Sequence, residues 1–293
     1  VPSGVSLAPG GGLTLTGALA VDGGTVKLDG NYPVGTDNVA MGNTALDSVE
    51  AGGINNVAIG DDAGTAITTG DNNVAVGKDA LLSTTTAANN VAIGSFSLDA
   101  NTTGESNTGI GRNSLSDNID GTYNTAVGHN SLANNTTADN NTAMGYNALV
   151  TNTTGCQNVA VGTCSLSANT DAFKNVAVGF EAGKDNTTAD NLTAIGFQAA
   201  QNNTTGGGNT SVGSAALNTN TTGSSNTAMG SGALYANTTA SNNTAIGAGA
   251  LDTNTTGANN TALGTNSLTA NTTANDNTAV GANALLTNTT GAR

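Results

Sequence analysis

Short apolar segments recur along the chain, and each ends in a glycine at a fixed distance from the one before. Nearly every segment reads Asn, Val or Thr, Ala, an apolar residue and Gly, as in residues 124–128; the exceptions are Gly109 and Ser211 in place of Ala and Leu192 in place of Asn. The first two glycines are 18 residues apart and all later neighbours are 17 apart. A disordered tract has no reason to keep such a register, so the pattern predicts stacked repeats. The fifteen glycines are Gly42, Gly60, Gly77, Gly94, Gly111, Gly128, Gly145, Gly162, Gly179, Gly196, Gly213, Gly230, Gly247, Gly264 and Gly281.

The repeat predicts strands rather than helices. The apolar segment alternates with period 2 and is rich in β-branched residues, whereas helical solenoid units need roughly 33 to 47 residues. We therefore predict an all-β fold, a parallel β-solenoid of fifteen 17-residue coils over residues 37–293, preceded by a β-rich connector or cap at 1–36. We expect a second strand in each coil, from the Ala/Ser-Leu pair (148–149) towards the Asn-Thr-Thr turn. At about 4.8 Å per coil, the rod is roughly 65–70 Å long.

Stacking in register places like residues in columns. We expect glycine to supply unusual backbone angles at one corner, and the Asn and Thr columns to form hydrogen-bonded ladders along the stack. The residues expected to carry the architecture are Gly60, Gly77, Gly94, Gly111, Gly128, Gly145, Gly162, Ile59, Val76, Val127, Leu132 and Leu149.

The alternation also predicts self-association. Neighbouring strand residues point to opposite faces, so the Ala column and the Val/Ile/Met column cannot both face the same way. One of them fills the thin coil and the other would form a long exposed apolar patch. Burial against identical chains, as a homotrimer, is the favoured solution; a monomer with both faces inside is the alternative.

Composition excludes several partners. With 6 basic and 20 acidic residues, a net charge of -14 and 3% aromatic residues, the chain is expected to bind no nucleic acid. No apolar run is long enough to span a membrane, so no membrane insertion is expected. The chain opens at Val1 without a signal segment, which is expected of a mature product or part of a longer one.

Catalytic chemistry lacks suitable residues, so we predict no enzyme activity. The only His is His129, at a variable position of the repeat, which favours a surface side chain over a catalytic base or an ion ligand on a trimer axis. Glycosidases use a pair of carboxylates, and the acid pairs here are Asp61-Asp62 and Glu181-Asp185. They lie at non-repeating positions, so we interpret them as solvent-exposed negative charges rather than catalytic groups. Calcium-binding nonapeptides and EF-hand loops are absent from the sequence, so neither metal nor cofactor is expected.

Three smaller features bear on the surface chemistry of the chain. Cys156 and Cys164 are eight residues apart, and free thiols are favoured over a disulfide. The Asn-x-Thr sequons, as at Asn101, Asn152 and Asn254, could carry glycans in a eukaryotic or archaeal source. The Thr pairs are adjacent rather than alternating, so both cannot lie on one strand face, which argues against an ice-binding solenoid.

The repeat resembles the head repeat of YadA-like trimeric autotransporter adhesins. The matching segments are residues 56–63, Asn-Val-Ala-Ile-Gly-Asp-Asp-Ala, and residues 124–131, Asn-Thr-Ala-Val-Gly-His-Asn-Ser, and the likeness covers about 38–293. It implies a left-handed β-roll wound from three chains into a matrix-binding head. The period of 17 and the Thr-for-Val replacements depart from that family's usual pattern.

The opening segment is similar to modules of tailed-phage fibres. Residues 12–28 alternate as short strands with Gly turns, as in fibres of marine phages, which are also homotrimers. We therefore favour an extracellular, virion-borne tail fibre for host or surface attachment over a bacterial surface adhesin head, with a self-assembling extracellular filament as a third class. The partners would be identical chains and an unidentified surface receptor. The rare aromatic residues are the expected contact points: Tyr123, Phe173, with Lys174 beside it, Phe180 and Phe197.

Overall fold

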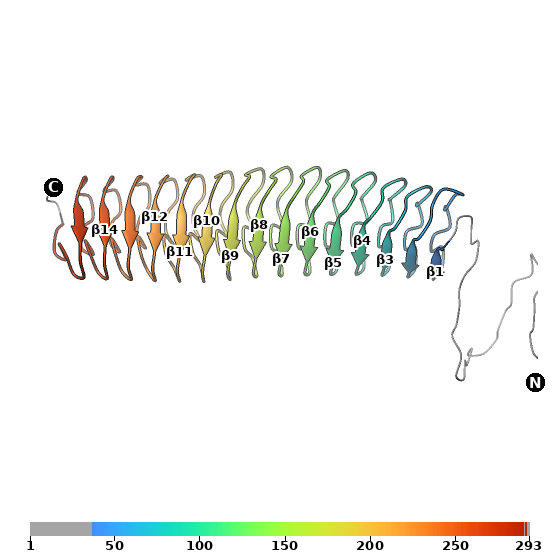
Figure 1. Ribbon diagram of the computed structural model, residues 1–293, viewed down its shortest axis with the longest axis horizontal. Coiled ribbons are helices and arrows are strands. Elements are labelled where there is room, and N and C mark those ends of the chain that lie inside the picture. The colour runs from blue at the N-terminus through green and yellow to red at the C-terminus, as the bar shows by residue number, and fades with distance from the viewer. Residues whose placement is uncertain (1–36, 290, 292–293) are drawn as a thin grey trace, which may run out of the picture.

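The chain winds into a single parallel β-solenoid, a rod in which the strands follow one another in chain order (Figure 1). The computed structural model describes residues 37–289 and 291. The predicted connector at 1–36 lies outside these residues. The fifteen three-residue strands are β1 (Val39–Met41), β2 (Val57–Ile59), β3 (Val74–Val76), β4 (Val91–Ile93), β5 (Thr108–Ile110), β6 (Thr125–Val127), β7 (Thr142–Met144), β8 (Val159–Val161), β9 (Val176–Val178), β10 (Thr193–Ile195), β11 (Thr210–Val212), β12 (Thr227–Met229), β13 (Thr244–Ile246), β14 (Thr261–Leu263) and β15 (Thr278–Val280).

Strand register follows the repeat. Val39 pairs with Val57 across the 18-residue step, and Thr125 pairs with Thr142 across an ordinary 17-residue step. Fifteen strands in one sheet enclose about fourteen turns of about 17 residues. The predicted all-β parallel solenoid is therefore confirmed.

The predicted second strand is wrong. The segment after each glycine is a run of turns in which alternate residues have positive φ, for example Asn113 and Leu115, both at 54°. The Leu115 amide donates to the Ser131 carbonyl of the next coil at 3.1 Å, whereas the Asn113 amide donates to Ser95 of the previous coil at 3.1 Å. A left-handed conformation costs a Leu roughly 1–2 kcal/mol, which full burial of its side chain, at about 1.5–3 kcal/mol, offsets.

The core consists of two apolar columns. The central residue of each strand, which is Ala in all strands except β5 and β11, faces inward and packs with the Leu column, in which Leu132 and Leu149 are fully buried. The first and third residues of each strand face outward. The expected opposition of the Ala and Val/Ile/Met faces is confirmed, and in the single chain the latter face lies outside.

Two asparagine ladders run along the stack, as expected. Before every strand except β10, one Asn carboxamide joins neighbouring coils: Asn124 Oδ1 accepts a hydrogen bond from the Asn141 backbone amide at 2.9 Å and Asn124 Nδ2 donates to the Ala138 carbonyl at 2.7 Å. At the turn position that reads Asn-Thr-Thr in most coils, Asn118 Nδ2 donates to Asn101 Oδ1 at 2.7 Å, and the contact repeats coil by coil to Asn271. These amides are buried, so each rung satisfies groups that would otherwise be costly to desolvate.

The corner glycines are fixed by two constraints. A Cβ on Gly128 would lie 2.6 Å from the Gly145 carbonyl oxygen of the next coil, a contact that no side chain could accept. Their φ values also favour glycine, between 131° and 142° in the seven glycines predicted to carry the architecture: Gly60, Gly77, Gly94, Gly111, Gly128, Gly145 and Gly162.

The ladders and the core are interrupted together near the middle of the rod. Gly183 and Ala200 replace two members of the Leu column, and Leu192 replaces an Asn of the strand-entry ladder. Leu192 is fully buried, and its Cδ2 lies 3.1 Å from the place of a Cβ on Gly183. Asn175 Nδ2, one coil earlier, is buried without a hydrogen-bond partner. The displaced leucine thus fills the core at the expense of one rung of the ladder.

Candidate binding surface

The outward face of the sheet is an apolar strip along the rod, here called the strand-face stripe. It comprises the first and third residues of β1–β15. The third position is apolar in every strand, and its side chain is 39% exposed at Ile59 and 43% exposed at Met144, while Val76 and Val127 are half-buried. Such an exposed row exceeds the scattered apolar residues of ordinary surfaces. Ten third-position side chains are exposed: those of Met41, Ile59, Ile93, Ile110, Met144, Ile195, Met229, Ile246, Leu263 and Val280.

The first position of the stripe changes character along the rod. It is Val in β1–β4, β8 and β9, and Thr in the other nine strands. The stripe is therefore most apolar towards the N-terminal end and more hydroxylated over β10–β15. Both residue types are half-buried or exposed, so neither takes part in the core.

A second surface feature, the corner column, follows the repeat glycines. In five consecutive coils it places four aromatic rings on the surface, those of His129, Tyr146, Phe180 and Phe197, with Thr163 in the middle. His129 stacks on Tyr146 with centroids 5.7 Å apart, and Phe180 stacks on Phe197 with centroids 5.5 Å apart. Its fifteen members are Asn43, Asp61, Lys78, Ser95, Arg112, His129, Tyr146, Thr163, Phe180, Phe197, Ser214, Ser231, Ala248, Thr265 and Ala282.

The structure brings together only two of the four predicted contact residues. Phe180 and Phe197 form a stacked pair, whereas Tyr123 and Phe173 lie in the turns before strands β6 and β9, in different coils. Lys174 Nζ lies 5.5 Å from the Phe173 ring centroid. Sequence reasoning missed Tyr146, although its place directly after a repeat glycine is the same as that of Phe180.

His129 is held between a ring and a cation. Besides the stack on Tyr146, its Nε2 lies 3.4 Å from Arg112 Nη1. Within the residues that the structure describes, no group of three or more His, Cys, Asp or Glu side chains is arranged to hold a metal ion. Cys156 and Cys164 are free thiols, as favoured from the sequence.

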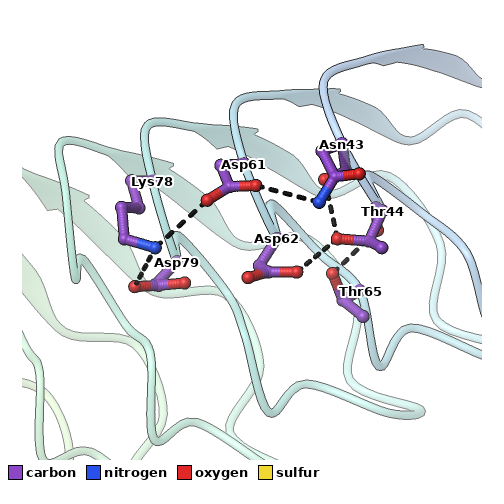
Figure 2. Close-up of polar contacts among 7 residues, drawn as sticks. All are labelled: Asn43, Thr44, Asp61, Asp62, Thr65, Lys78 and Asp79. Carbon is purple, nitrogen blue, oxygen red and sulfur yellow. Dashed lines mark hydrogen bonds and ion pairs between the residues drawn. The ribbon is translucent and has the colours of Figure 1, made fainter.

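The acid pair at the N-terminal end of the rod makes separate contacts (Figure 2). Asp61 accepts a hydrogen bond from Lys78 Nζ at 3.2 Å and one from Asn43 Nδ2 at 3.2 Å, while Asp62 accepts from Thr44. The hydrogen bond from Lys78 lowers the pKa of Asp61. A glycosidase acid needs a raised pKa, so Asp61 is unsuited to that role.

Glu181 is also held in its ionised form. Gln198 Nε2 donates to Glu181 Oε2 at 2.8 Å, Gln201 Nε2 donates to the same oxygen at 2.6 Å, and Lys184 Nζ lies 3.1 Å from Oε1. These hydrogen bonds, that of Gln198 most of all, lower the pKa of Glu181. The carboxylate organises a polar surface network next to Phe180.

Asp99 differs from the other acids. Burial raises its pKa from the ordinary 3.8 to about 6, and its Oδ1 is buried without a hydrogen-bond partner. Burial also raises the pKa of Asp252. The raised pKa of Asp99 favours its neutral form, so this carboxyl makes the rod less stable as the pH rises through about 6.

No helix long and apolar enough to cross a membrane occurs in the part of the chain that the structure describes. Comparison with protein families, with curated proteins and with solved structures finds no match to this chain.

Proposed function

We propose that the chain is a structural and adhesive fibre protein: a rigid homotrimeric rod that attaches to a host or another surface, in the manner of a phage tail fibre. The observation that supports it is the strand-face stripe, an outward apolar row that continues through all fifteen strands. The count of three and the left-handed β-roll come from the likeness to trimeric adhesin heads. The exposed apolar row supports self-association, because contact with identical chains would bury it.

The rod is suited to attachment by its rigidity. In-register ladders of buried amides join neighbouring coils. Threonine hydroxyls add hydrogen bonds nearer the surface; Thr153 Oγ1, for example, donates to the Thr170 carbonyl at 3.1 Å. Three identical copies would present every surface residue three times, which raises avidity without new contacts. The proposed location is extracellular, on a virion or a cell surface.

The proposal is tested by converting one apolar stripe residue into a charged one. Ile110→Lys places an ammonium group in the centre of the proposed interface, and Thr137→Lys, at an exposed position of the Asn-Thr-Thr turn, is the matched control. We expect light scattering to give about three chain masses for wild type and Thr137→Lys, and a smaller particle for Ile110→Lys. Equal masses for all three proteins would contradict the proposed interface.

The two other attachment classes share the same rod. A bacterial adhesin head would differ in what the rod is joined to. An extracellular filament would use the outer edges of β1 and β15, the end strands of the described sheet, because an unpaired strand edge can template another copy. Particles of varied length in electron micrographs would favour the filament.

A second candidate function, ice binding, is favoured by the strand threonines. The adjacent Thr pairs lie in turns, but nine strands carry a Thr that shares the outward face with an apolar residue, at about 4.8 Å per coil. This face would have to be free of partner chains. Thermal hysteresis by a single-chain particle would support ice binding, and its absence would exclude it.

A further inference from the structure

The stacked rings of the corner column have a regular geometry. His129 and Tyr146 come from consecutive coils and their planes differ by 12°; those of Phe180 and Phe197 differ by 10°. Both centroid distances, 5.7 and 5.5 Å, are close to the coil rise of about 4.8 Å. The rings of each pair therefore face one another along the rod.

The column lacks one ring between the two pairs. Thr163 occupies that coil, and its short side chain is exposed. Tyr146 and Phe180 lie two coils apart, roughly 9.6 Å at the usual strand spacing. A ring placed outside Thr163 would lie about 4.8 Å from each of them, within the 4.5–7 Å range of favourable ring stacking. A ligand ring would complete the column.

We propose that Tyr146, Thr163 and Phe180 form a binding site for an uncharged hexopyranose. This deepens the proposed attachment function by naming its ligand class, and it rests on that function only for its biological role. The C–H faces of a pyranose carry positive partial charge and suit the negative faces of Tyr146 and Phe180. Both aromatic side chains are accessible, Tyr146 being 52% and Phe180 45% exposed.

The surrounding groups favour a neutral sugar over other rings. The next residues in the chain are Asn147 and Glu181, and their polar groups can hydrogen-bond to sugar hydroxyls. A hot spot for a partner protein would instead be surrounded by groups that exclude water. The hydrogen-bonded Glu181 carboxylate, with its lowered pKa, and the net charge of -14 oppose an anionic sugar. An aromatic side chain of a partner protein is the competing occupant.

The test uses the full chain and saturation-transfer NMR with methyl glucoside, galactoside and mannoside, methyl glucuronide, and N-acetyl-tyrosine amide. Thr163→Phe supplies the missing ring and blocks the site, whereas Thr265→Phe makes the same change between Ala248 and Ala282. Phe180→Ala removes one wall, and Tyr235→Ala removes an exposed ring from a different column.

We expect at least one neutral pyranoside to bind wild type, Thr265→Phe and Tyr235→Ala. Binding should weaken at least fivefold in Thr163→Phe and Phe180→Ala, as for loss of one stacking contact. No binding by any pyranoside, binding that survives Thr163→Phe, or preference for the glucuronide or the tyrosine amide would overturn the proposal. Light scattering on the same samples reports the assembly separately, so failure of the sugar site is distinguishable from failure of the trimeric rod.

Discussion

Gly183 and Leu192 are expected to compensate for one another, and restoring the consensus at both tests this directly. Gly183→Leu alone would force a second leucine into space that Leu192 fills, because a Cβ there already lies 3.1 Å from Leu192 Cδ2 and 3.1 Å from Leu166 Cδ2. Overpacking of this kind costs about 1–3 kcal/mol. Leu192→Asn alone would empty a fully buried site, and Leu truncation there costs about 2–5 kcal/mol.

The double variant should recover most of this loss. A leucine at 183 would join the Leu column at a backbone angle, φ 57°, close to that of its neighbour Leu166 at 47°. An asparagine at 192 would offer its Oδ1 to the Asn209 amide, as Asn209 Oδ1 serves Asn226 at 2.9 Å. Each restored hydrogen bond contributes about 1 kcal/mol. We therefore expect the double variant to lie within about 1 kcal/mol of wild type.

Urea denaturation followed by far-UV circular dichroism measures the three variants against wild type. The two single variants together cost at least about 3 kcal/mol and the double variant at most about 1 kcal/mol, so the expected coupling free energy is at least about 2 kcal/mol, as for residues in contact. Additive effects within about 0.5 kcal/mol would refute the reasoning, because they would mean that the two sites do not share one space.

Three further predictions follow from the ladders, the corner and the buried acid. Asn152→Asp replaces an amide that donates to Asn135 Oδ1 at 3.1 Å and to the Gly155 carbonyl at 2.8 Å. It should therefore lower the free energy of unfolding at pH 7 by about 3 kcal/mol. The control Asn134→Asp, at an exposed position, should change it very little. Equal urea midpoints for the two variants would contradict the buried ladder. Gly128→Ala should prevent native stacking or cost more than about 3 kcal/mol of stability. In Gly208→Ala the new Cβ would lie 3.7 Å from its nearest neighbour, so this variant should lose only about 1–2 kcal/mol to backbone strain. Similar shifts in melting temperature for the two variants would contradict the close approach of the corner glycines. For Asp99 the folded pKa is about 6 and the ordinary value 3.8, so its contribution is full below pH 3.8 and is lost as pH rises through 6. Because the group is half-buried, the loss should be about 1 kcal/mol, and Asp99→Asn should remove that part of the slope between pH 4 and 7; an unchanged slope would exclude Asp99 as its source.

Periodicity predicted most of the fold because each repeat position has one environment. Alternation at residues such as Thr125, Ala126 and Val127 predicted that neighbouring side chains face opposite sides of the sheet, and the nearly constant Asn predicted the ladders. The prediction of a second strand is wrong because it requires an extended backbone at Leu132, whose φ is 52°. Sequence spacing does not report such alternating backbone angles, which depend on hydrogen bonds to both neighbouring coils.

The surface was harder to predict from the sequence. Phe180 and Phe197 were singled out for their rarity, but pairing them with each other required the column in which they stack. Tyr146 was missed because its repeat looks ordinary apart from the residue after Gly145. Tyr123 and Phe173 share rarity but not a location, so composition alone could not separate a site from isolated rings.

The strand-face stripe is proposed to be covered by copies of the same chain. The most direct measurement is the native mass by light scattering on a sizing column, at concentrations spanning two orders of magnitude. The proposed homotrimer requires a stable particle of about three times 28.2 kDa. A particle of 28.2 kDa throughout would contradict it, because the whole apolar row would then face water.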